Sequence, residues 1–379
     1  MIMYIRTFDL HSDLDNLKGF HFILHQLLCK DELNPCDVLI FDIETTGFSP
    51  KNTFCYLIGC IYFQNNTFKL IQWFADSSQD EKEILEAFFE FSKDYKALLH
   101  YNGNGFDIPY LIQKSSNYEL NQTFHLKESI DLYKLLSPYK KFFKLENLKQ
   151  KTVETFLDIT REDKFSGGQL IHVYSQYLIQ PDEEAKRLLL LHNKEDLCGL
   201  FGLLPILSYH ALFNGLFSVK GFDVKPYTDM YHEQQFEFFI ELKLQVELPK
   251  RISYGTGDFY FIGNKNTGKL KIKVNSNELK YFYSNYKDYY YLPNEDIAIH
   301  KSVASFVNKE FRSKAKSSNC YIKKSGYFLP QHQTIVSPCF RENYNDKKTF
   351  FELTDDILNN EALIKKYVLH IFDVLIHNN

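Results

Sequence analysis

The sequence has 379 residues, 44% of them hydrophobic and 24% charged, which is typical of globular protein and enough for two domains with separate cores. Its formal net charge of −4 excludes a general polycation, so any affinity for nucleic acid must come from local basic segments. The seven cysteines include no Cys-x-x-Cys pair, which argues against a zinc ribbon or a disulfide scaffold and favours reduced thiols.

The N-terminal residues lack the basic segment and long apolar run of a secretion signal, so we expect a cytoplasmic protein. No stretch approaches the roughly 20 consecutive apolar residues that span a bilayer, and we therefore expect no membrane partner. The aromatic share is 16%, and most of these side chains must pack in cores and sheets.

The first 36 residues are predicted to form a short strand and an amphipathic helix, an N-terminal extension without chemistry. From Asp37 the pattern becomes rich in strands. A strand that begins at Val38 and two more at 54–63 and 68–74 predict an antiparallel meander. Helical patterns and a fourth strand follow, the helices near 78–94, after 107, and at 145–157, 168–178 and 182–207, and the strand at 97–101. This order predicts an α/β domain over residues 37–212.

Residues 213–379 have a different pattern, and we expect an α+β accessory region of unclear role. Alternating residues predict strands within 236–283, and Gly-Asn-Lys-Asn-Thr-Gly at 263–268 predicts a turn between two of them. Two helices are expected at the end of the chain, near 295–311 and 354–377.

The strand that begins at Val38 ends in two carboxylates, Asp42 and Glu44. Because strand side chains alternate, both carboxylates point to the same face of the sheet. Two like charges at the end of a buried strand cost several kcal/mol per ion unless a counter-charge is supplied, and a divalent cation is the simplest one. The alternative is a solvated strand end whose acids cap the next turn.

A third acid, Asp107, follows the loop Asn-Gly-Asn-Gly-Phe after another strand. A Gly-rich junction between strand and helix brings backbone amides near a ligand, to which Asn102 and Asn104 can add side-chain hydrogen bonds. Taken alone, Asp107 is better explained as a helix cap than as a ligand. Asp131, after a later turn, is also interpreted as structural.

His192 and Asp196 are one helical turn apart and share a face with leucines. Polar groups on an apolar stripe need partners. For a histidine considered alone, the alternative is a core residue whose hydrogen bonds are satisfied within the protein.

The order of these motifs is more specific than any one of them. It resembles the DEDD superfamily of 3′-5′ exonucleases, which have the RNase H-like fold, and most closely the YprB-like ribonuclease H-like domain. The resemblance covers about residues 37–210 and is carried by Phe-Asp-Ile-Glu-Thr-Thr-Gly (41–47), Tyr-Asn-Gly-Asn-Gly-Phe-Asp-Ile-Pro-Tyr-Leu (101–111), Asp-Leu-Tyr-Lys-Leu-Leu (131–136), Arg-Glu-Asp-Lys-Phe-Ser-Gly-Gly (161–168) and His-Asn-Lys-Glu-Asp-Leu (192–197).

The resemblance implies a mixed RNase H-like sheet flanked by helices, and a two-metal site. Its ligands would be Asp42, Glu44, Asp107 and Asp196, hard oxygen donors that suit two Mg²⁺ or Mn²⁺ ions. His192 would accept a proton from the attacking water. The two well-known branches of the superfamily place a Tyr four residues, or a His five residues, before the last Asp, whereas here a His stands at the four-residue spacing.

The same resemblance implies that the substrate is single-stranded DNA or RNA. Residues near the acids would contact its terminal nucleotide, namely Thr45, Thr46, Asn102, Asn104 and Phe106. Two basic segments with aromatic residues, 139–151 and 311–327, could bind the strand through phosphate attraction and stacking, and their representatives are Lys144, Arg312 and Lys323. The alternative for each segment is a solvated face.

Three functions are consistent with these patterns. The first is a metal-dependent 3′-5′ exonuclease. The second is a non-catalytic nucleic-acid-binding or scaffolding protein that keeps the fold, although none of the four acids is replaced by Asn, Ala or Gly. The third is a structure-specific endonuclease.

Overall fold

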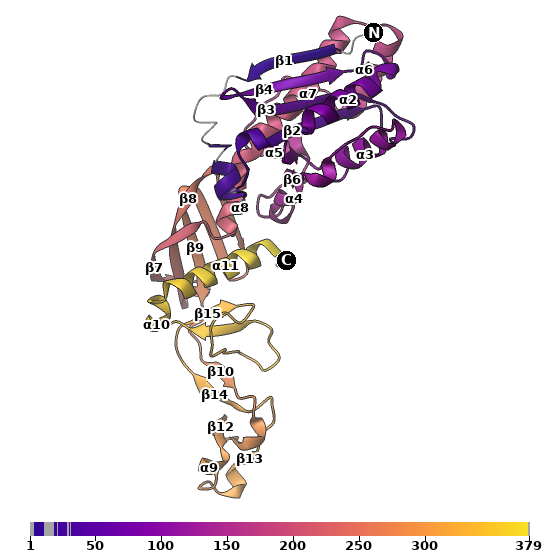
Figure 1. Ribbon diagram of the computed structural model, residues 1–379. Coiled ribbons are helices and arrows are strands. Elements are labelled where there is room, and N and C mark those ends of the chain that lie inside the picture. The colour runs from indigo at the N-terminus through magenta and orange to yellow at the C-terminus, as the bar shows by residue number, and fades with distance from the viewer. Residues whose placement is uncertain (1–3, 11–18, 21, 29, 31, 378–379) are drawn as a thin grey trace. The chain divides into compact units, whose positions relative to one another are not determined.

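The computed structural model describes residues 4–10, 19–20, 22–28, 30 and 32–377 (Figure 1). The chain divides into two compact units, Met1–Ala211 and Leu212–Asn379. The six cysteines within the described residues are free thiols.

The first unit is built on a six-stranded mixed sheet with the strand order β1-β4-β3-β2-β5-β6. Strands β2, β3 and β4 pair antiparallel, as predicted for the meander, and β1 pairs antiparallel with β4. Strands β2, β5 and β6 are parallel. The strands are β1 (Tyr4–Leu10), β2 (Val38–Thr45), β3 (Cys55–Gln64), β4 (Thr67–Phe74), β5 (Ala97–His100) and β6 (Glu128–Asp131). Strand β1 comes from the segment expected to be a separate extension, yet it pairs with β4 along its length.

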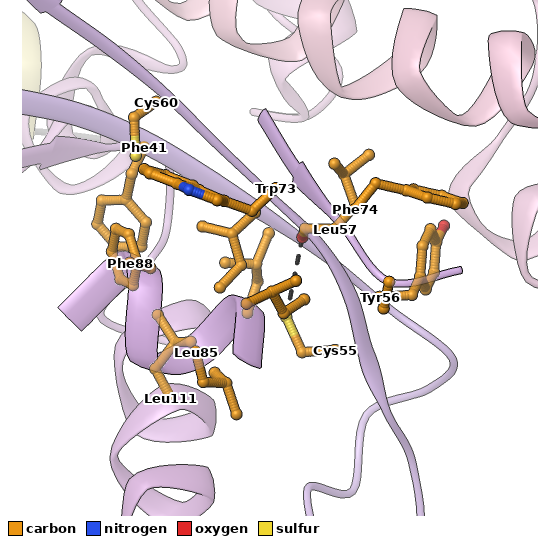
Figure 2. Close-up of a cluster of buried hydrophobic side chains, with 14 of the residues drawn as sticks. Phe41, Cys55, Tyr56, Leu57, Cys60, Trp73, Phe74, Leu85, Phe88 and Leu111 are labelled. Carbon is orange, nitrogen blue, oxygen red and sulfur yellow. Dashed lines mark hydrogen bonds between the residues drawn. The ribbon is translucent and has the colours of Figure 1, made fainter. Parts of the chain in front are cut away.

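Strand β2 is buried on both faces, which its continuous apolar run predicted. On one face Phe41 packs against Phe88 of α2 (Glu81–Ser92), with ring centroids 5.6 Å apart, and Trp73 joins the same cluster (Figure 2). The opposite face is covered by α7 (Glu183–Leu203), which contacts β2 and β3. Side-chain alternation therefore directs Asp42 and Glu44 toward α7.

Gly59 of β3 explains how closely α7 approaches the sheet. A Cβ at this position would lie 2.0 Å from Oδ1 of Asn193 and 2.6 Å from Cδ1 of Leu197. Any side chain at position 59 would thus push the helix away from the strand that carries the acids.

The unit also contains the shorter helices α3 (Asp107–Asn117), α4 (Leu132–Leu136), α5 (Gln150–Phe156) and α6 (Gly167–Ile179). The boundary between the units falls within α8 (Leu207–Phe213). Helix α5 begins five residues later than the 145–157 pattern predicted. The residues before it are irregular, and the side-chain oxygen of Asn147 accepts a hydrogen bond from the N–H of Lys149 at 2.9 Å. The long helix ends before Pro205, as expected.

The stretch Glu183–Phe213 is long and apolar enough to cross a membrane by length and composition. This corrects the expectation that no such stretch exists. However, 67% of its apolar window is buried inside the structure, a burial that the core helix of a globular unit also shows. Length and composition alone are therefore weak evidence of a membrane span.

The second unit is built on a three-stranded antiparallel sheet of β7 (Phe217–Thr228), β8 (Gln234–Thr256) and β9 (Phe259–Val274). Helix α11 (Glu361–His377) packs on it through Phe372, whose ring lies 5.2 Å from that of Phe261. The predicted turn at 263–268 is wrong, because these residues continue β9. The glycine- and asparagine-rich segment instead occupies a bulged region where the β8–β9 register shifts.

Three small sheets follow: β10 (Leu279–Phe282) with β14 (Tyr321–Lys324), β11 (Tyr289–Leu292) with β12 (Ile297–His300) and β13 (Ser313–Lys314), and β15 (Phe328–Gln331) with β16 (Thr349–Glu352). The prediction of a helix at 295–311 is wrong. Residues Ile297–His300 pair with β11 instead, and only α9 (Lys301–Ala304) and the 3-10 turn Lys309–Phe311 are helical. The last predicted helix is present as α10 (Asp355–Leu358) and α11.

Candidate active site

Asp42 and Glu44 lie on the part of β2 that β5 does not cover. The β2–β5 pairing ends at Ile40, so the following residues have a free edge on that side. Asn193 of α7 donates from Nδ2 to Oδ2 of Asp42 at 2.9 Å. Gln72 in turn donates from Nε2 to Oδ1 of Asn193, also at 2.9 Å. This chain of hydrogen bonds fixes the orientation of one carboxylate oxygen of Asp42.

Asp107 is brought to the same edge by the loop after β5. Its carboxylate accepts a hydrogen bond from the backbone N–H of Ile43, which β5 leaves unpaired. The loop turns at Asn102, whose φ is 59°, and its N–H donates to Oδ1 of Asp131 at 2.9 Å. Asp131 also accepts from the N–H of Lys134 as the cap of α4, so its structural interpretation is confirmed.

His192 and Asp196 face these acids from α7. Nε2 of His192 lies 3.2 Å from Oδ2 of Asp196 and 3.6 Å from Oε1 of Glu44. One potential ligand atom from each of the three residues lies within 4.8 Å of the others, a spacing that could hold a metal ion. The tertiary structure thus joins β2 to a helix about 150 residues later in the chain.

The electrostatics of the site fit a divalent cation. Burial, followed by the charges of Asp196 and Glu44, raises the pKa of Asp42 well above its usual range. Burial, followed by Asp196 and Asp107, does the same to the pKa of Glu44. Burial raises the pKa of Asp107 to about 7, although hydrogen bonds oppose the shift. Carboxylates that repel one another in this way are stabilised by a bound divalent cation, for which their oxygens are suitable ligands.

Arg161 supplies a positive charge beside Asp196. It donates from Nη1 to Oδ1 of Asp196, while Nε and Nη2 donate to the carboxylate of Glu154. Gly199 makes room for this pair, because a Cβ there would lie 2.0 Å from Oε1 of Glu154. In the sequence, the segment 161–168 is distinguished only by its resemblance to other proteins. The contact between Arg161 and Asp196 could not have been predicted, because neither Arg161 nor Gly199 belongs to a pattern that indicates an ion pair.

Asp163, in the same segment, lies within hydrogen-bond distance of His192. Its Oδ2 lies 2.6 Å from Nδ1 of the histidine. Asp163 and Asn193 are thus two polar neighbours of the site that sequence reasoning missed. Nothing in their local sequence distinguishes them from ordinary polar residues on a loop and a helix.

Most residues expected to contact substrate have internal partners. Thr45 donates from Oγ1 to the carbonyl of Gly47 at 2.9 Å, and Oγ1 of Thr46 accepts from the N–H of Phe54. Oδ1 of Asn104 accepts from Oγ of Ser129. These side chains stabilise the loops beside the acids. The side chain of Asn102 lies at the surface.

Phe106 is partly exposed and packs edge-to-face against Phe48, with ring centroids 5.8 Å apart. Phe48 is 89% exposed and follows the acids of β2 by four residues. An aromatic ring so exposed beside a charged site has little to gain from folding and is available to stack on a ligand. Sequence reasoning missed Phe48, although an aromatic residue directly after Thr-Thr-Gly is a signal that could have identified it.

The basic segment 139–151 does not have the interleaved form that was expected. Phe142 and Phe143 are buried, with exposures of 1% and 4%, so these rings cannot stack on bases. Lys144 is exposed. Lys151, also at the surface, pairs with Asp163 at 3.2 Å. This segment therefore offers lysines without aromatic partners.

The second basic segment, in the second unit, is partly neutralised. Lys323 pairs with Asp296 at 2.6 Å and with Glu278 at 3.7 Å. Arg312 donates from Nη1 to the carbonyl of Ala304 and lies over the ring of Tyr290. Both side chains thus have partners within this unit, an arrangement that differs from the solvated face considered as the alternative.

Residues 39–208 match the model of the RNase H superfamily. The first unit accordingly has the RNase H-like mixed α/β fold that was predicted, and a β/α region follows it. No curated protein sequence matches the chain.

Solved structures with similar coordinates are distant in sequence. A family B DNA polymerase from Pyrobaculum calidifontis has 18% identity and a TM-score of 0.37, covering 46% of this chain and 26% of the polymerase. The EXO domain of Aedes aegypti Nibbler has 13% identity and a TM-score of 0.31, covering 54% of this chain and 93% of that domain. A zinc-bound complex of E. coli ExoI with single-stranded DNA has 12% identity and a TM-score of 0.28, with 55% of each chain covered.

Proposed function

We propose that the first unit is a metal-dependent 3′-5′ exonuclease that hydrolyses phosphodiester bonds of single-stranded DNA or RNA. The observation that carries this proposal is the convergence of Asp42 and Glu44 with Asp107 and Asp196 at one edge of the sheet, where burial and mutual repulsion raise the pKa of the first three. A site of this kind is costly to fold unless it binds cations.

The four acids would hold two Mg²⁺ or Mn²⁺ ions, which when bound activate water and stabilise the leaving oxygen. The protein side chains have three further tasks. Nε2 of His192 accepts a proton from the attacking water. Asn193 holds Asp42 in one orientation. Arg161 holds Asp196 by its other oxygen, leaving Oδ2 directed at His192.

A single-stranded substrate is favoured by the exposed aromatic side chains. Phe48 and Phe106 lie beside the acids, where they can stack on the terminal base. In the second unit, Phe306 is 90% exposed within a short segment that carries three exposed lysines, Lys309, Lys314 and Lys316. Phosphate attraction and stacking together bind single strands without sequence preference.

The charge distribution supports a role for the second unit in holding the strand. Residues 1–211 contain 21 Lys and Arg against 29 Asp and Glu, a formal charge of −8. Residues 212–379 contain 23 against 19, a formal charge of +4. A polyanion is therefore attracted more strongly to the second unit than to the first at long range.

The test is digestion of matched single-stranded DNA and RNA oligonucleotides, each labelled at one end, with Mg²⁺ or Mn²⁺. A 3′-5′ exonuclease produces a ladder from the 5′-labelled strand and releases labelled mononucleotide at once from the 3′-labelled strand. Asp42→Asn should abolish both products, whereas Asp94→Asn, an exposed acid on the same unit, should not. Binding without cleavage would instead support the scaffolding alternative, and cleavage of circular DNA would support an endonuclease.

A further inference from the structure

The segment Arg161–Gly168 has no role in the proposed function beyond Arg161, yet it lies directly against the site. Oδ2 of Asp163 is 2.6 Å from Nδ1 of His192, and the two side chains are only 3% and 5% exposed. A buried carboxylate in contact with one ring nitrogen determines which nitrogen carries the proton of a neutral imidazole.

Asp163 is itself held firmly. Its Oδ1 accepts from the N–H of Phe165 at 2.9 Å, and Lys151 contacts its Oδ2 at 3.2 Å. The backbone N–H groups of Glu162 and Asp163 both donate to the carboxylate of Glu195, at 2.8 and 2.7 Å. Glu195 belongs to α7, the helix that carries His192. The loop is thus attached to the same rigid element as the histidine that it contacts.

These contacts favour an ionised Asp163. Burial raises the pKa of this carboxyl, but the hydrogen bonds from Phe165, His192 and Lys151 outweigh burial and hold it below its usual value. An ionised carboxylate can only accept hydrogen bonds, so Nδ1 of His192 must be the donor. In the neutral ring the lone pair is then on Nε2.

The lone pair of Nε2 is directed toward the carboxylates of Glu44 and Asp196, at 3.6 and 3.2 Å. Three electron-rich atoms at this spacing repel one another unless a proton or a cation lies between them. The opposite tautomer would place an N–H there and could neither accept a proton nor leave room for a cation. The position of Asp163 therefore determines whether His192 can act as an acceptor at all.

We propose that Asp163 is a positioning residue that holds His192 in the Nδ1–H tautomer and so presents Nε2 as a proton acceptor toward Glu44 and Asp196. The role of that acceptor in hydrolysis rests on the proposed function, whereas the tautomer does not. Asp163 acts through His192 and has no contact of its own with the carboxylates of the site in the structure.

The first test is the tautomer of His192 in the wild-type full-length chain, free of metal, at a pH where the ¹⁵N shifts of the ring show it to be neutral. Two-bond ¹H–¹⁵N correlations distinguish Nδ1–H from Nε2–H, and the spectrum of His192→Gln assigns the signal. We expect Nδ1–H in the wild type. An Nε2–H tautomer there overturns the inference without the need for any Asp163 variant.

The second test is Asp163→Asn, compared with Glu162→Gln, its exposed neighbour on the same loop. An asparagine amide can donate to Nδ1, which would reverse the tautomer, as the corresponding change does in the Ser-His-Asp triad of proteases. We expect kcat to fall by about 10²–10⁴-fold, KM and Mn²⁺ affinity to change less than about 3-fold, and the Nε2–H tautomer to appear. Glu162→Gln should change none of these quantities.

An Asp163→Asn enzyme with wild-type kcat would overturn the inference, and so would an unchanged tautomer. Failure of the proposed function can be distinguished from failure of this inference. If the wild-type chain shows Nδ1–H but cleaves no oligonucleotide with either metal, the proposed hydrolysis is wrong while the positioning of His192 by Asp163 stands.

Discussion

Asn193 donates a hydrogen bond to Asp42 at 2.9 Å across 151 residues of sequence, and it accepts one from Gln72 at the same distance. Asn193 is fully buried. It is therefore the connection between the helix that carries His192 and the strand that carries the first two acids. Its loss would remove one of the two acceptors of Gln72, which also donates to the carbonyl of Leu190, and would leave Asp42 without its donor.

Asn193→Ala should lower the free energy of unfolding by about 1–3 kcal/mol, since two buried polar partners lose a hydrogen bond. It should also weaken Mn²⁺ binding, because Asp42 is no longer oriented. Urea unfolding and calorimetric titration measure the two effects. Asn121→Ala, at an exposed site of the same unit, is the control and should change neither.

Asp107→Asn should stabilise the protein when no metal is bound. The variant should no longer be stabilised when Mg²⁺ is added. The pKa of Asp107 is raised to about 7, so between pH about 4 and 7 the folded state binds more protons than the unfolded state. Stability in EDTA should therefore fall as the pH rises through this range. Removing the charge should raise Tm at pH 8, by about 2–4 °C for each kcal/mol recovered. A lower Tm for the variant in EDTA would contradict this account.

His100 should make the protein sensitive to acid. Burial lowers the pKa of His100 to about 4, and its ring nitrogens contact Ser129 and the N–H of Gly103. Below pH 6.5 the unfolded state binds a proton that the folded state does not, so stability should fall by up to about 1.4 kcal/mol per pH unit down to pH 4. His100→Gln should reduce this pH dependence in urea unfolding at pH 5 and 7. His172→Gln, on the surface, should leave it unchanged.

Phe48→Ala should weaken binding of a single-stranded oligonucleotide without loss of stability. Stacking of one base contributes about 1–3 kcal/mol, which corresponds to roughly 5–150-fold in affinity. The ring is 89% exposed, so Tm should be unchanged. Fluorescence anisotropy with Ca²⁺ in place of Mg²⁺ measures the affinity. Ile179→Ala, at an 86% exposed position, is the matched control, and equal affinities for both variants would rule out stacking by Phe48.

Phe306→Ala combined with Lys309→Ala should reduce the affinity for single strands. It should also make the slope of log K against log salt concentration shallower, by about one unit or less. Phe306 is 90% exposed and Lys309 is at the surface, so folding should be unaffected. Met230→Ala, 85% exposed on the same unit, should bind like the wild type. An unchanged salt slope in the double variant would exclude this segment from phosphate contact.

The sheet of the first unit could be predicted because its signals are local. The apolar run that begins at Val38, and the two strands after it, have the composition of buried strands, and they form the predicted meander. The same reasoning was wrong for 263–268 and 295–311. In the first case a bulge accommodates the glycines and asparagines of a long strand, and in the second β11 pairs with residues whose local pattern resembled a helix.

By itself, the sequence determined which residue types stand at the end of β2, at the start of α3 and on one face of α7, because strand and helix periodicity place Asp42 with Glu44 and His192 with Asp196. Only the tertiary structure decided which oxygen faces which nitrogen. Asp163 reaches His192 from a loop 29 residues earlier, held by Glu195. Contacts of this kind depend on the path of a loop, which no local periodicity encodes, and they determine the proton position on His192.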